Sequence, residues 1–431
     1  MNVADSRRLA STLEKLGYEP TNKPNEAGII VLNTCVVRQS AEDKAIGRLS
    51  SLRPLKDKNP DLVINLMGCL IGVRGNQKIL DKFPWVDVVS PPSDPEPLLH
   101  FLIERNAKIT SLNKQSAVNA LLDEDLMLPK DEQGKLVSAY IPIVYGCSHA
   151  CTYCIIPSKR GIEHSRPYEL ILAEAHALAS QGVKEITLLG QIVDRYGLDL
   201  PQKTTLARLL TDLNTIEGLR RIRFLTSHPN WMTDELLEAV ANLPKVCEHI
   251  EVPIQAGDDD VLRAMRRGYT AQFYRDLISR IREGIPGVSI ATDIIVGFPG
   301  ETEEQFQATY DLLDELQMDV AHLARYSPRT GTYSERKMED NVPEAEKMRR
   351  FRLLEDLQEK IATEINEKMI GSIVSVLIEE NSRGRWRGRT RTNKLIFVDS
   401  EEDLLGQECN VRIHWAGPWS MVGALERIDT H

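Results

Sequence analysis

Apolar positions in the first hundred residues recur first at helical and then at strand spacing. A leucine repeat over residues 9–16 stops before Gly17, which predicts an amphipathic helix that ends there. Two short, continuous apolar runs follow, over residues 28–32 and 62–67, as in buried strands of a parallel sheet. The pattern therefore predicts an N-terminal α/β domain over residues 1–105, built on a parallel sheet.

Six further strand-like runs alternate with helical stretches in the middle of the chain. A polar, partly acidic stretch over residues 106–135 precedes them and is interpreted as a linker. Strands alternating with helices predict a parallel sheet curled into a partial, TIM-like (βα)6 barrel over residues 136–368. In such barrels the working loops lie at the carboxyl ends of the strands. The expected strands are residues 139–144, 185–189, 222–225, 250–254, 290–296 and 321–326.

A different pattern follows a long charged helix that is expected over residues 343–369. Short strands separated by Gly and Pro turns predict a small C-terminal β-barrel over residues 369–431. Its expected strands are residues 373–378, 395–398, 408–414 and 420–425.

Composition narrows the class of protein. The chain has 431 residues, of which 42% are hydrophobic and 27% charged, which is globular composition for two or three domains. A net charge of −10 gives no global basic field, so nucleic-acid contact needs local patches. Seven cysteines, an odd number, favour metal or catalytic use in a reducing compartment. No apolar run is long enough to span a membrane and no signal-peptide core begins the chain, so we expect a cytoplasmic protein.

Three cysteines, Cys147, Cys151 and Cys154, follow the first expected barrel strand and are the candidate catalytic residues. Thiolates at this spacing can hold three irons of a 4Fe–4S cluster. No fourth cysteine follows nearby, so one iron stays open for the amino and carboxylate groups of S-adenosylmethionine, which Tyr153 would flank. A structural zinc loop with His149 as fourth ligand is the alternative, and the spacing favours it less.

The cysteine triplet resembles the signature of the radical S-adenosylmethionine superfamily. Further segments narrow the resemblance to the methylthiotransferases, and best to the MiaB type, which modify tRNA. The similarity covers essentially the whole chain, and the order and number of the matching segments make it specific. These segments are Asn33-Thr34-Cys35-Val36-Val37-Arg38, Met67-Gly68-Cys69, residues 157–167, Leu188-Leu189-Gly190-Gln191, Met265-Arg266-Arg267-Gly268-Tyr269, Gly297-Phe298-Pro299-Gly300-Glu301-Thr302 and Tyr326-Ser327-Pro328-Arg329.

The resemblance implies an enzyme with two 4Fe–4S clusters that uses S-adenosylmethionine. In the family, the barrel cluster cleaves this cofactor to a 5′-deoxyadenosyl radical, which can attack an unactivated aromatic C–H bond. A second cluster in the N-terminal domain supplies sulfur, and a second S-adenosylmethionine supplies the methyl group. Cys35 and Cys69, each just past an expected strand, match two of the three cysteines of that second cluster. Burial in an apolar core is the commoner fate of a lone cysteine, but the shared position past strand ends and the resemblance favour the ligand interpretation.

The implied reaction is methylthiolation of C2 of N6-isopentenyladenosine at position 37 of tRNA, next to the anticodon. The implied partners are tRNA and an electron donor such as flavodoxin or ferredoxin, whereas the sequence does not identify the sulfur source. Two alternatives keep the same chemistry, on N6-threonylcarbamoyladenosine in tRNA or on an aspartate of a ribosomal protein.

One departure from the family pattern lies at the beginning of the sequence. In the family, the sequence before the position of Asn2 forms a strand that is followed by the motif Gly-Cys-x-Met-Asn. This sequence begins instead at Met1-Asn2. The third cysteine and its strand are therefore not in it, and we expect a misplaced start codon or a truncation. If the chain is truly this short, two thiolates would hold the second cluster poorly. An inactive RNA-binding homologue is then a further alternative.

Five positions are cofactor-binding candidates through the resemblance. Gly190 and Gln191 follow the second expected barrel strand, in a region that contacts the cofactor's amino group in the superfamily. Gln255 lies after the fourth strand, and Gly297 and Gly300 after the fifth, where glycine lets the backbone approach a ligand. A plain tight turn is the alternative for each glycine.

Two further loop positions and two further cysteines remain, of which Cys409 lies in the C-terminal module. Asp194 and Arg195 follow Gln191 in a loop that lies near the active site in the family, and they are weaker candidates. Cys247 and Cys409 are interpreted as packed thiols without a metal role.

The C-terminal module carries a local basic cluster on an acidic protein. It resembles the TRAM domain, a small RNA-binding barrel. Alternate arginines on a strand share one face and suit phosphates, and a tryptophan among them can stack on a base. A solvated charged face is the alternative. The amino-acid sequence of residues 390–394 matches that of the tRNA-modifying enzymes, which argues against a ribosomal-protein substrate. The RNA-binding candidates are Arg385, Trp386, Arg389, Arg391 and Lys394.

Overall fold

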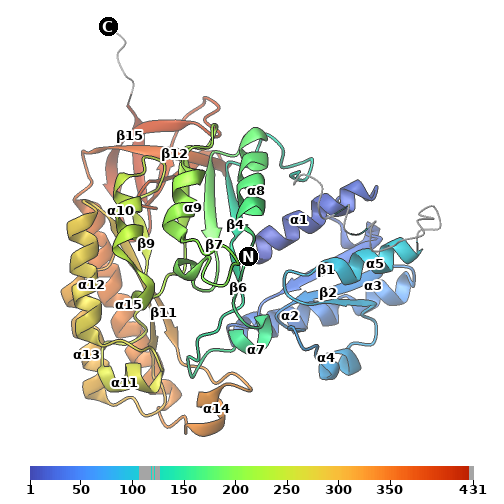
Figure 1. Ribbon diagram of the computed structural model, residues 1–431, viewed down its shortest axis with the longest axis horizontal. Helices are drawn as coiled ribbons and strands as arrows, with labels where there is room; N and C mark the ends of the chain where they lie inside the picture. Colours follow the sequence, from blue (N-terminus) through green and yellow to red (C-terminus); the bar gives the residue numbers. More distant parts are fainter. Residues whose placement is uncertain (106–117, 119–120, 122–126, 427–431) are drawn as a thin grey trace.

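The computed structural model describes residues 1–105, 118, 121 and 127–426 (Figure 1). Most of the expected linker, residues 106–126, lies outside the described part apart from positions 118 and 121. Within the described residues, no helix is long and apolar enough to cross a membrane.

The N-terminal region is a three-stranded parallel sheet with helices on both faces, as the apolar pattern predicts. The strand order is β1-β2-β3, and one apolar cluster lies on each side of the sheet. The central strand β2 is buried along its whole length. The bounds are α1 Asn2–Lys15, β1 Ile29–Thr34, α2 Gln39–Ser51, α3 Arg53–Lys58, β2 Val63–Gly68, α4 Gln77–Lys82, β3 Val88–Ser90 and α5 Glu96–Arg105.

The central region is a curled parallel sheet of six strands in chain order, which confirms the expected partial barrel. The strands pair as β4-β7-β8 and β9-β10-β11, and a bridge between Ile222 and Val246 joins the two groups. Both edge strands are fully described and do not pair with each other, so the barrel is open between β4 and β11. The strands are β4 Ser138–Pro142, β7 Glu185–Leu189, β8 Arg221–Phe224, β9 His249–Glu251, β10 Ser289–Val296 and β11 Val320–Arg325.

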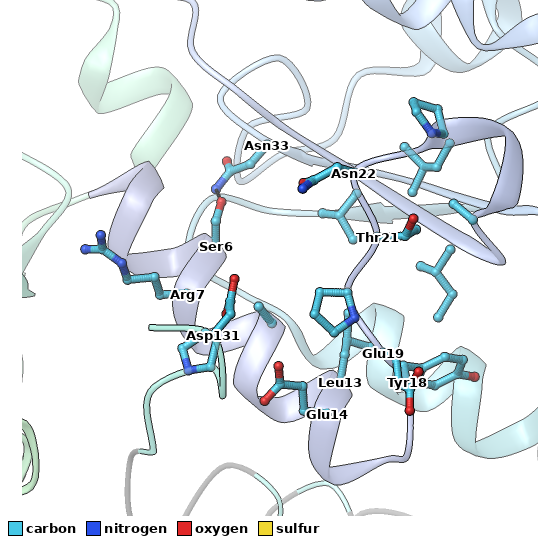
Figure 2. Close-up of a pocket in the computed structure, with 18 of the residues that line it drawn as sticks. Ser6, Arg7, Leu13, Glu14, Tyr18, Glu19, Thr21, Asn22, Asn33 and Asp131 are labelled. Atoms are coloured by element: carbon cyan, nitrogen blue, oxygen red, sulfur yellow. Dashed lines mark hydrogen bonds between the residues drawn. The ribbon is translucent and has the colours of Figure 1, made fainter. Parts of the chain in front are cut away.

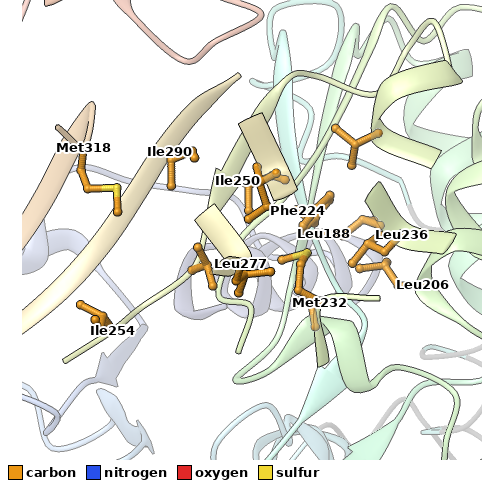
Figure 3. Close-up of a cluster of buried hydrophobic side chains, with 14 of the residues drawn as sticks. Leu188, Leu206, Phe224, Met232, Leu236, Ile250, Ile254, Leu277, Ile290 and Met318 are labelled. Atoms are coloured by element: carbon orange, nitrogen blue, oxygen red, sulfur yellow. The ribbon is translucent and has the colours of Figure 1, made fainter. Parts of the chain in front are cut away.

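Helices cover the outside of this curled sheet, and the main hydrophobic core lies between the two layers (Figure 3). Alternate strand residues such as Leu188, Phe224, Ile250 and Ile290 point outward into that core. Their neighbours therefore point to the inside of the barrel. The covering helices are α8 Tyr168–Ser180, α9 Leu206–Leu213, α10 Asp234–Asn242, α11 Asp259–Ala264, α12 Ala271–Gly284, α13 Glu303–Leu316 and α15 Glu344–Glu367.

Two strand boundaries differ from the sequence-based expectation. The fourth barrel strand, expected over residues 250–254, leaves the ladder at Glu251. Pro253 has no N–H to donate, and Gln255 has a positive φ of 81°, so the backbone cannot continue as a regular strand. The first strand, expected over residues 139–144, ends at Pro142, and β5 (Val144–Tyr145) then pairs with β6 (His164–Ser165).

The C-terminal module is a closed five-stranded β-barrel, as expected, in the order β12-β13-β14-β16-β15. The arginine-rich stretch, which is not among the four expected strands of this module, forms β13. Its burial alternates, so its arginines face outward while Trp386, Gly388 and Thr390 face the inside. The strands are β12 Ile373–Ser382, β13 Arg385–Thr390, β14 Leu395–Val398, β15 Glu408–Ala416 and β16 Met421–Leu425.

Candidate functional site

The cysteine triplet begins directly after β5, at the carboxyl end of the first barrel strand. Gly146 precedes Cys147 with φ +64°, and a Cβ at Gly146 would lie 2.1 Å from the carbonyl oxygen of Ile162. Glycine is therefore required there to bring the loop back toward Gly161, whose carbonyl accepts a hydrogen bond from Cys147 N–H at 3.1 Å.

Thr152 fixes the rest of the cysteine loop. Its N–H donates to the Met265 carbonyl at 3.2 Å, and its hydroxyl donates to the Ala264 carbonyl at 2.9 Å. Its own carbonyl accepts from Ser334 N–H at 2.9 Å. Cys151 and Cys154 flank this anchor, so their positions are set by contacts with two distant segments of the barrel.

A buried arginine lies against the loop. Nη1 of Arg267 lies 3.3 Å from Sγ of Cys151, Nε donates to the Tyr269 hydroxyl at 2.9 Å, and Nη2 reaches the Pro253 carbonyl at 3.3 Å. Arg267 belongs to a segment that carries the resemblance, but the sequence gives it no role. Only the folded chain brings it to Cys151, which lies 116 residues away in sequence.

Burial disfavours the charged form of two thiols of the triplet, Cys147 and Cys154. Burial is the main cause that raises the pKa of Cys147, and it raises the pKa of Cys154 to about 12. A metal ion removes the proton of a ligating thiol, and the Arg267 guanidinium lies beside the Cys151 sulfur. The three sulfurs therefore fit a positively charged metal centre better than a set of free anions.

The donor set also fits a cluster. Within the described parts of the chain, no three His, Cys, Asp or Glu side chains gather as ligands of one ion. In a 4Fe–4S cluster each thiolate binds a different iron, so its three cysteines need not converge on one point. His149, the possible zinc ligand, instead accepts a hydrogen bond at Nε2 from Trp231 Nε1 at 3.3 Å.

Three of the cofactor candidates, Tyr153, Gly297 and Gly300, differ in what they contact. The Tyr153 ring meets Phe298 edge to face, at 6.5 Å between ring centroids, which brings it to the loop after β10. A Cβ at Gly297 would lie 2.3 Å from Cγ of Lys347, so packing against α15 is sufficient to require that glycine. No atom lies within 4 Å of a Cβ built at Gly300. Contact of these residues with a cofactor stays a prediction.

The remaining cofactor candidates lie on the loops after β7 and β9. A Cβ at Gly190 would lie 3.0 Å from Cβ of Val144, which is a close approach between two loops. Gln191 Nε2 lies 3.3 Å from Sδ of Met1, at the junction with the N-terminal domain. Gln255 is buried, and its N–H donates to the Asp293 carbonyl at 2.8 Å.

A polar cluster beside the cysteine loop includes the weaker candidates. Asp194 Oδ2 accepts from His228 N–H at 2.9 Å, and burial raises the pKa of Asp194 to about 7. Arg195 pairs with Glu163 at 2.8 Å and stacks over Trp231 at 4.3 Å from the ring centroid. His228 was missed in the sequence, since a single histidine in a loop gives no signal of its own.

Cys35 and Cys69 lie at the carboxyl ends of β1 and β2, which are neighbours in the N-terminal sheet. A Cβ at Gly68, whose φ is +99°, would lie 2.6 Å from the Thr34 carbonyl oxygen, which also accepts from Cys69 N–H at 3.1 Å. The Cys69 loop and the Cys147 loop thus each begin with a glycine, Gly68 and Gly146, that no other residue can replace without strain. Cys35 is exposed and Cys69 is buried.

The second cysteine site faces the barrel. Val73 N–H donates to the Lys159 carbonyl at 3.0 Å, which joins the loop after Cys69 to α7 (Ile156–Arg160), just beyond Cys154. Burial raises the pKa of the Cys69 thiol, and the Arg160 guanidinium opposes that rise. Arg160 also donates to Asn2 Oδ1 at 2.9 Å, so α7 contacts both α1 and the Cys69 loop.

Two large cavities lie away from the cysteines. One of about 1140 Å³ lies between α1, the segment after it and β1, and no cysteine lines it (Figure 2). The other, of about 960 Å³, lies at the open side of the barrel and reaches inward-facing residues such as Thr187, Glu251 and His322. Residues of the small barrel, including Arg387, Arg389 and Trp419, form part of its wall.

The structure corrects the interpretation of Trp386. Its side chain is only 9% exposed and belongs to the core of the small barrel, and its Nε1–H donates to the Ser400 carbonyl at 3.2 Å. It cannot stack on a base without leaving that core. The exposed tryptophans of the module are Trp415 and Trp419. The sequence did not distinguish them, because which tryptophan fills the barrel depends on the strand register.

Two of the basic candidates connect the small barrel to the floor of the large one. Arg391 pairs with Glu248 at 2.6 Å, and Lys394 pairs with Asp319 at 2.6 Å. Lys394 is almost buried there. Arg385 and Arg389 are more exposed, and Arg385 pairs with Asp399 at 2.7 Å. RNA contact by these residues stays a prediction, and it is least compatible with the position of Lys394.

Comparison with known families follows this division of the chain. Residues 1–90 match the model described as uncharacterized protein family UPF0004, residues 141–313 match the radical SAM superfamily, and residues 367–424 match the TRAM domain. The tRNA-2-methylthio-N(6)-dimethylallyladenosine synthase of Roseiflexus sp. is 46% identical over 100% of this chain and 88% of its own length. The enzyme of the same name from Chloroflexus aurantiacus is 45% identical over 100% of this chain and 90% of its own.

Solved structures share the fold at low sequence identity. The radical S-adenosylmethionine methyltransferase TsrM from Kitasatospora setae, with cobalamin and a [4Fe-4S] cluster bound, aligns with a TM-score of 0.55 at 14% identity. The alignment covers 89% of this chain and 74% of that one. The cobalamin-dependent radical enzyme OxsB aligns with a TM-score of 0.52 at 15% identity, over 84% of this chain and 53% of that one.

Proposed function

Because the chain belongs to the MiaB-type radical S-adenosylmethionine methylthiotransferases, we propose that it places a methylthio group on C2 of N6-isopentenyladenosine in tRNA, at position 37 beside the anticodon. Such an enzyme works where tRNA is, in the cytoplasm. The relatives with this substrate in their names match over the whole chain, including the small barrel, which supports the nucleoside over a ribosomal-protein aspartate.

The observation that carries the proposal is the convergence of two cysteine loops across one domain junction. Cys147, Cys151 and Cys154 begin at the carboxyl edge of the barrel, and the Cys69 loop contacts α7 on the same side. Sulfur insertion requires a radical site and a sulfur donor to meet one substrate carbon. A junction that brings both cysteine loops to α7 provides this proximity.

Each part of the chain has a distinct task in this proposal. When bound, the barrel cluster supplies the electron that cleaves S-adenosylmethionine, and a second cluster supplies sulfur. Arg267 places a positive charge beside the Cys151 sulfur. Thr152 and Gly146 fix the loop that carries the three ligands. Gly190, Gln191 and Gln255 lie on neighbouring loops at the same edge, where a cofactor over that loop would contact them.

The second cluster is part of the proposal. Cys35 and Cys69 are two of its ligands, and the described residues place no third cysteine at the edge of this sheet. Arg160, which hydrogen-bonds Asn2 and lies against Cys69, would favour a thiolate there. The electron donor is proposed to be a flavodoxin or ferredoxin, which delivers single electrons at low potential.

Iron and sulfide content after anaerobic reconstitution of the 431-residue chain tests both clusters. About eight irons per chain are expected when both form, and about four when only the barrel cluster forms. Changing Cys151 to Ala should remove the barrel cluster and abolish cleavage of S-adenosylmethionine. Changing Cys409 to Ala, a cysteine in the small barrel, is the matched control and should leave the iron content unchanged.

The substrate is tested with tRNA that carries N6-isopentenyladenosine. Mass spectrometry of digested tRNA should show 2-methylthio-N6-isopentenyladenosine only when enzyme, cofactor and reductant are all present. Product on N6-threonylcarbamoyladenosine or on a ribosomal-protein peptide instead would replace the proposed substrate. RNA binding without cleavage of the cofactor by the iron-loaded chain would identify an inactive homologue.

A further inference from the structure

We propose that the cavity between the open side of the large barrel and the small barrel takes an unpaired nucleotide of the RNA substrate, with Trp419 as the surface on which its base stacks. This inference rests on the proposed function and adds a place of RNA contact to it.

Trp419 is the most exposed tryptophan in the described chain. Its residue is 57% exposed, whereas Trp386 is buried in the core of the small barrel. A large aromatic left in solvent costs free energy, because its apolar area stays in contact with water. Such exposure indicates a binding surface when the side chain is held in place, and stacking of a base on an aromatic ring is one established use of it.

The turn that carries Trp419 is held rigidly. Gly417 N–H donates to the Ser420 carbonyl at 3.0 Å, and Asn366 at the end of α15 donates to the carbonyls of Gly417 at 2.8 Å and Pro418 at 3.2 Å. A tryptophan on a fixed turn loses little conformational entropy when it binds a base.

The cavity beside Trp419 has the volume of a ligand site. It encloses about 960 Å³, and pockets for nucleotide-sized ligands run to about 300–1,000 Å³. Its far wall is the inside of the barrel, where Tyr140 of β4 and His322 of β11 mark the two edge strands. Residues of the other four barrel strands line it as well, so the cavity extends from the opening between β4 and β11 into the interior of the barrel.

The charged groups at the entrance suit RNA more than an apolar peptide. Arg387 lines the cavity, and its side chain is 40% exposed with Glu380 as its partner, which is itself 48% exposed. Exposed ion pairs contribute only about 0–1 kcal/mol, so a phosphate can replace Glu380 at little cost. Lys135 and Arg389 also line the cavity, whose lining holds six Lys and Arg side chains against five carboxylates. An aromatic ring beside guanidinium groups is the combination that binds single-stranded RNA.

The test measures the affinity of the full-length chain for an RNA hairpin with an adenosine-containing loop. Trp419→Ala should weaken binding by roughly fivefold to a hundredfold, since one stacked base contributes about 1–3 kcal/mol. Trp419→Phe, which keeps a ring, should restore most of the affinity. Arg387→Ala should weaken binding and reduce the salt dependence by the equivalent of about one phosphate contact.

Trp415 provides a matched control on the same small barrel. It is 50% exposed but does not line the cavity, and its ring lies against Gly417. Trp415→Ala should bind RNA within about twofold of the parent chain, since no base stacks there. Unchanged thermal midpoints would show that each variant is folded.

Equal losses in the Trp415 and Trp419 variants, or none in either, would overturn the inference. If Trp419→Ala binds RNA normally but loses a ribosomal-protein peptide, the cavity takes protein instead. If the parent chain binds no RNA at all, the proposed function fails together with this inference. If the parent chain binds and modifies tRNA while Trp419→Ala matches it, only this inference fails.

Discussion

Arg267 shows how a single buried charge can tune the cysteine loop. Its guanidinium is 3.3 Å from Sγ of Cys151 and is fixed by the Tyr269 hydroxyl and the Pro253 carbonyl. A positive charge beside a cluster ligand stabilises the reduced, more negative state. We therefore expect the residue to affect both the retention of iron and the ease of its reduction.

Arg267→Met should lower the reduction potential of the barrel cluster. Losing about 1.4 kcal/mol of charge stabilisation corresponds to about 60 mV for one electron. Redox titration followed by electron paramagnetic resonance would measure the shift. Arg267→Lys keeps the charge and should shift the potential less. Equal potentials in the parent and Met variants would show that the guanidinium does not act on the cluster.

The buried carboxyl group of Asp194 should make the stability of the fold depend on pH. Burial raises its pKa to about 7, so the folded state holds the proton more tightly than the unfolded chain does. Its contribution to stability is therefore complete below about pH 4 and is lost as the pH rises through about 7. Asp194→Asn removes this loss, and should raise the free energy of unfolding at pH 8 by about 2 kcal/mol relative to the parent.

Denaturant unfolding of the metal-free chain at pH 5 and pH 8 measures this difference. The parent chain should lose stability between the two values, while the Asn variant loses less. Parallel profiles for the parent and Asp194→Asn would refute the assignment.

At the scale of elements, the turn between β13 and β14 holds the small barrel against the large one. Arg391 donates to Glu248 and to the carbonyls of Pro244 and Val246, which lie at the floor of the large barrel. In return, Arg223 of β8 donates to the Arg391 carbonyl at 2.6 Å. The turn thus fastens the small barrel to the amino ends of the barrel strands.

Arg391→Ala should loosen this docking and destabilise the chain by about 1–3 kcal/mol, because Glu248 loses its partner and two carbonyls lose a donor. Limited proteolysis should then cut earlier between α15 and β12. Arg385→Ala, whose partner Asp399 is exposed, is the control and should cost no more than about 0.5 kcal/mol. Equal protease resistance in both variants would contradict the docking role.

The elements themselves were largely predictable from the sequence. Strands β7 and β14 have the expected limits, because continuous apolar runs depend on local sequence. The cysteine positions after strand ends also followed from the pattern. The roles of Trp386, on β13, and Lys394, in the turn before β14, did not follow from the pattern. Whether such a side chain faces the interior of the small barrel, the large barrel or solvent depends on closure and docking of the module.

At the scale of the whole molecule, function depends on how the N-terminal domain sits against the barrel. Arg329, after β11, donates to both Gln39 and Glu42 of α2 and is almost completely buried. Arg8 of α1 pairs with Glu174 of α8, which Arg166 also contacts. These side chains fix the distance between the Cys35 and Cys69 loops and the barrel cysteines.

Arg329→Ala should therefore uncouple the two halves of the reaction. The barrel residues that hold the triplet are untouched, so cleavage of S-adenosylmethionine to 5′-deoxyadenosine should continue. Displacement of the N-terminal domain by even 1 Å should slow sulfur insertion strongly, since transfer between two centres depends on their alignment. The ratio of 5′-deoxyadenosine to methylthiolated tRNA should rise by about tenfold or more. Both products can be quantified by mass spectrometry in one reaction.

Arg349→Ala gives the comparison, because Arg349 also joins an acidic partner but lies on the barrel surface, with Glu303 and Glu346 around it. Its product ratio should equal that of the parent chain. If Arg329→Ala lowers both products in proportion, the arginine supports the fold as a whole. If it leaves both unchanged, the contact with α2 does not set the geometry between the two cysteine sites, and alignment must come from the Arg8 and Arg160 contacts of α1.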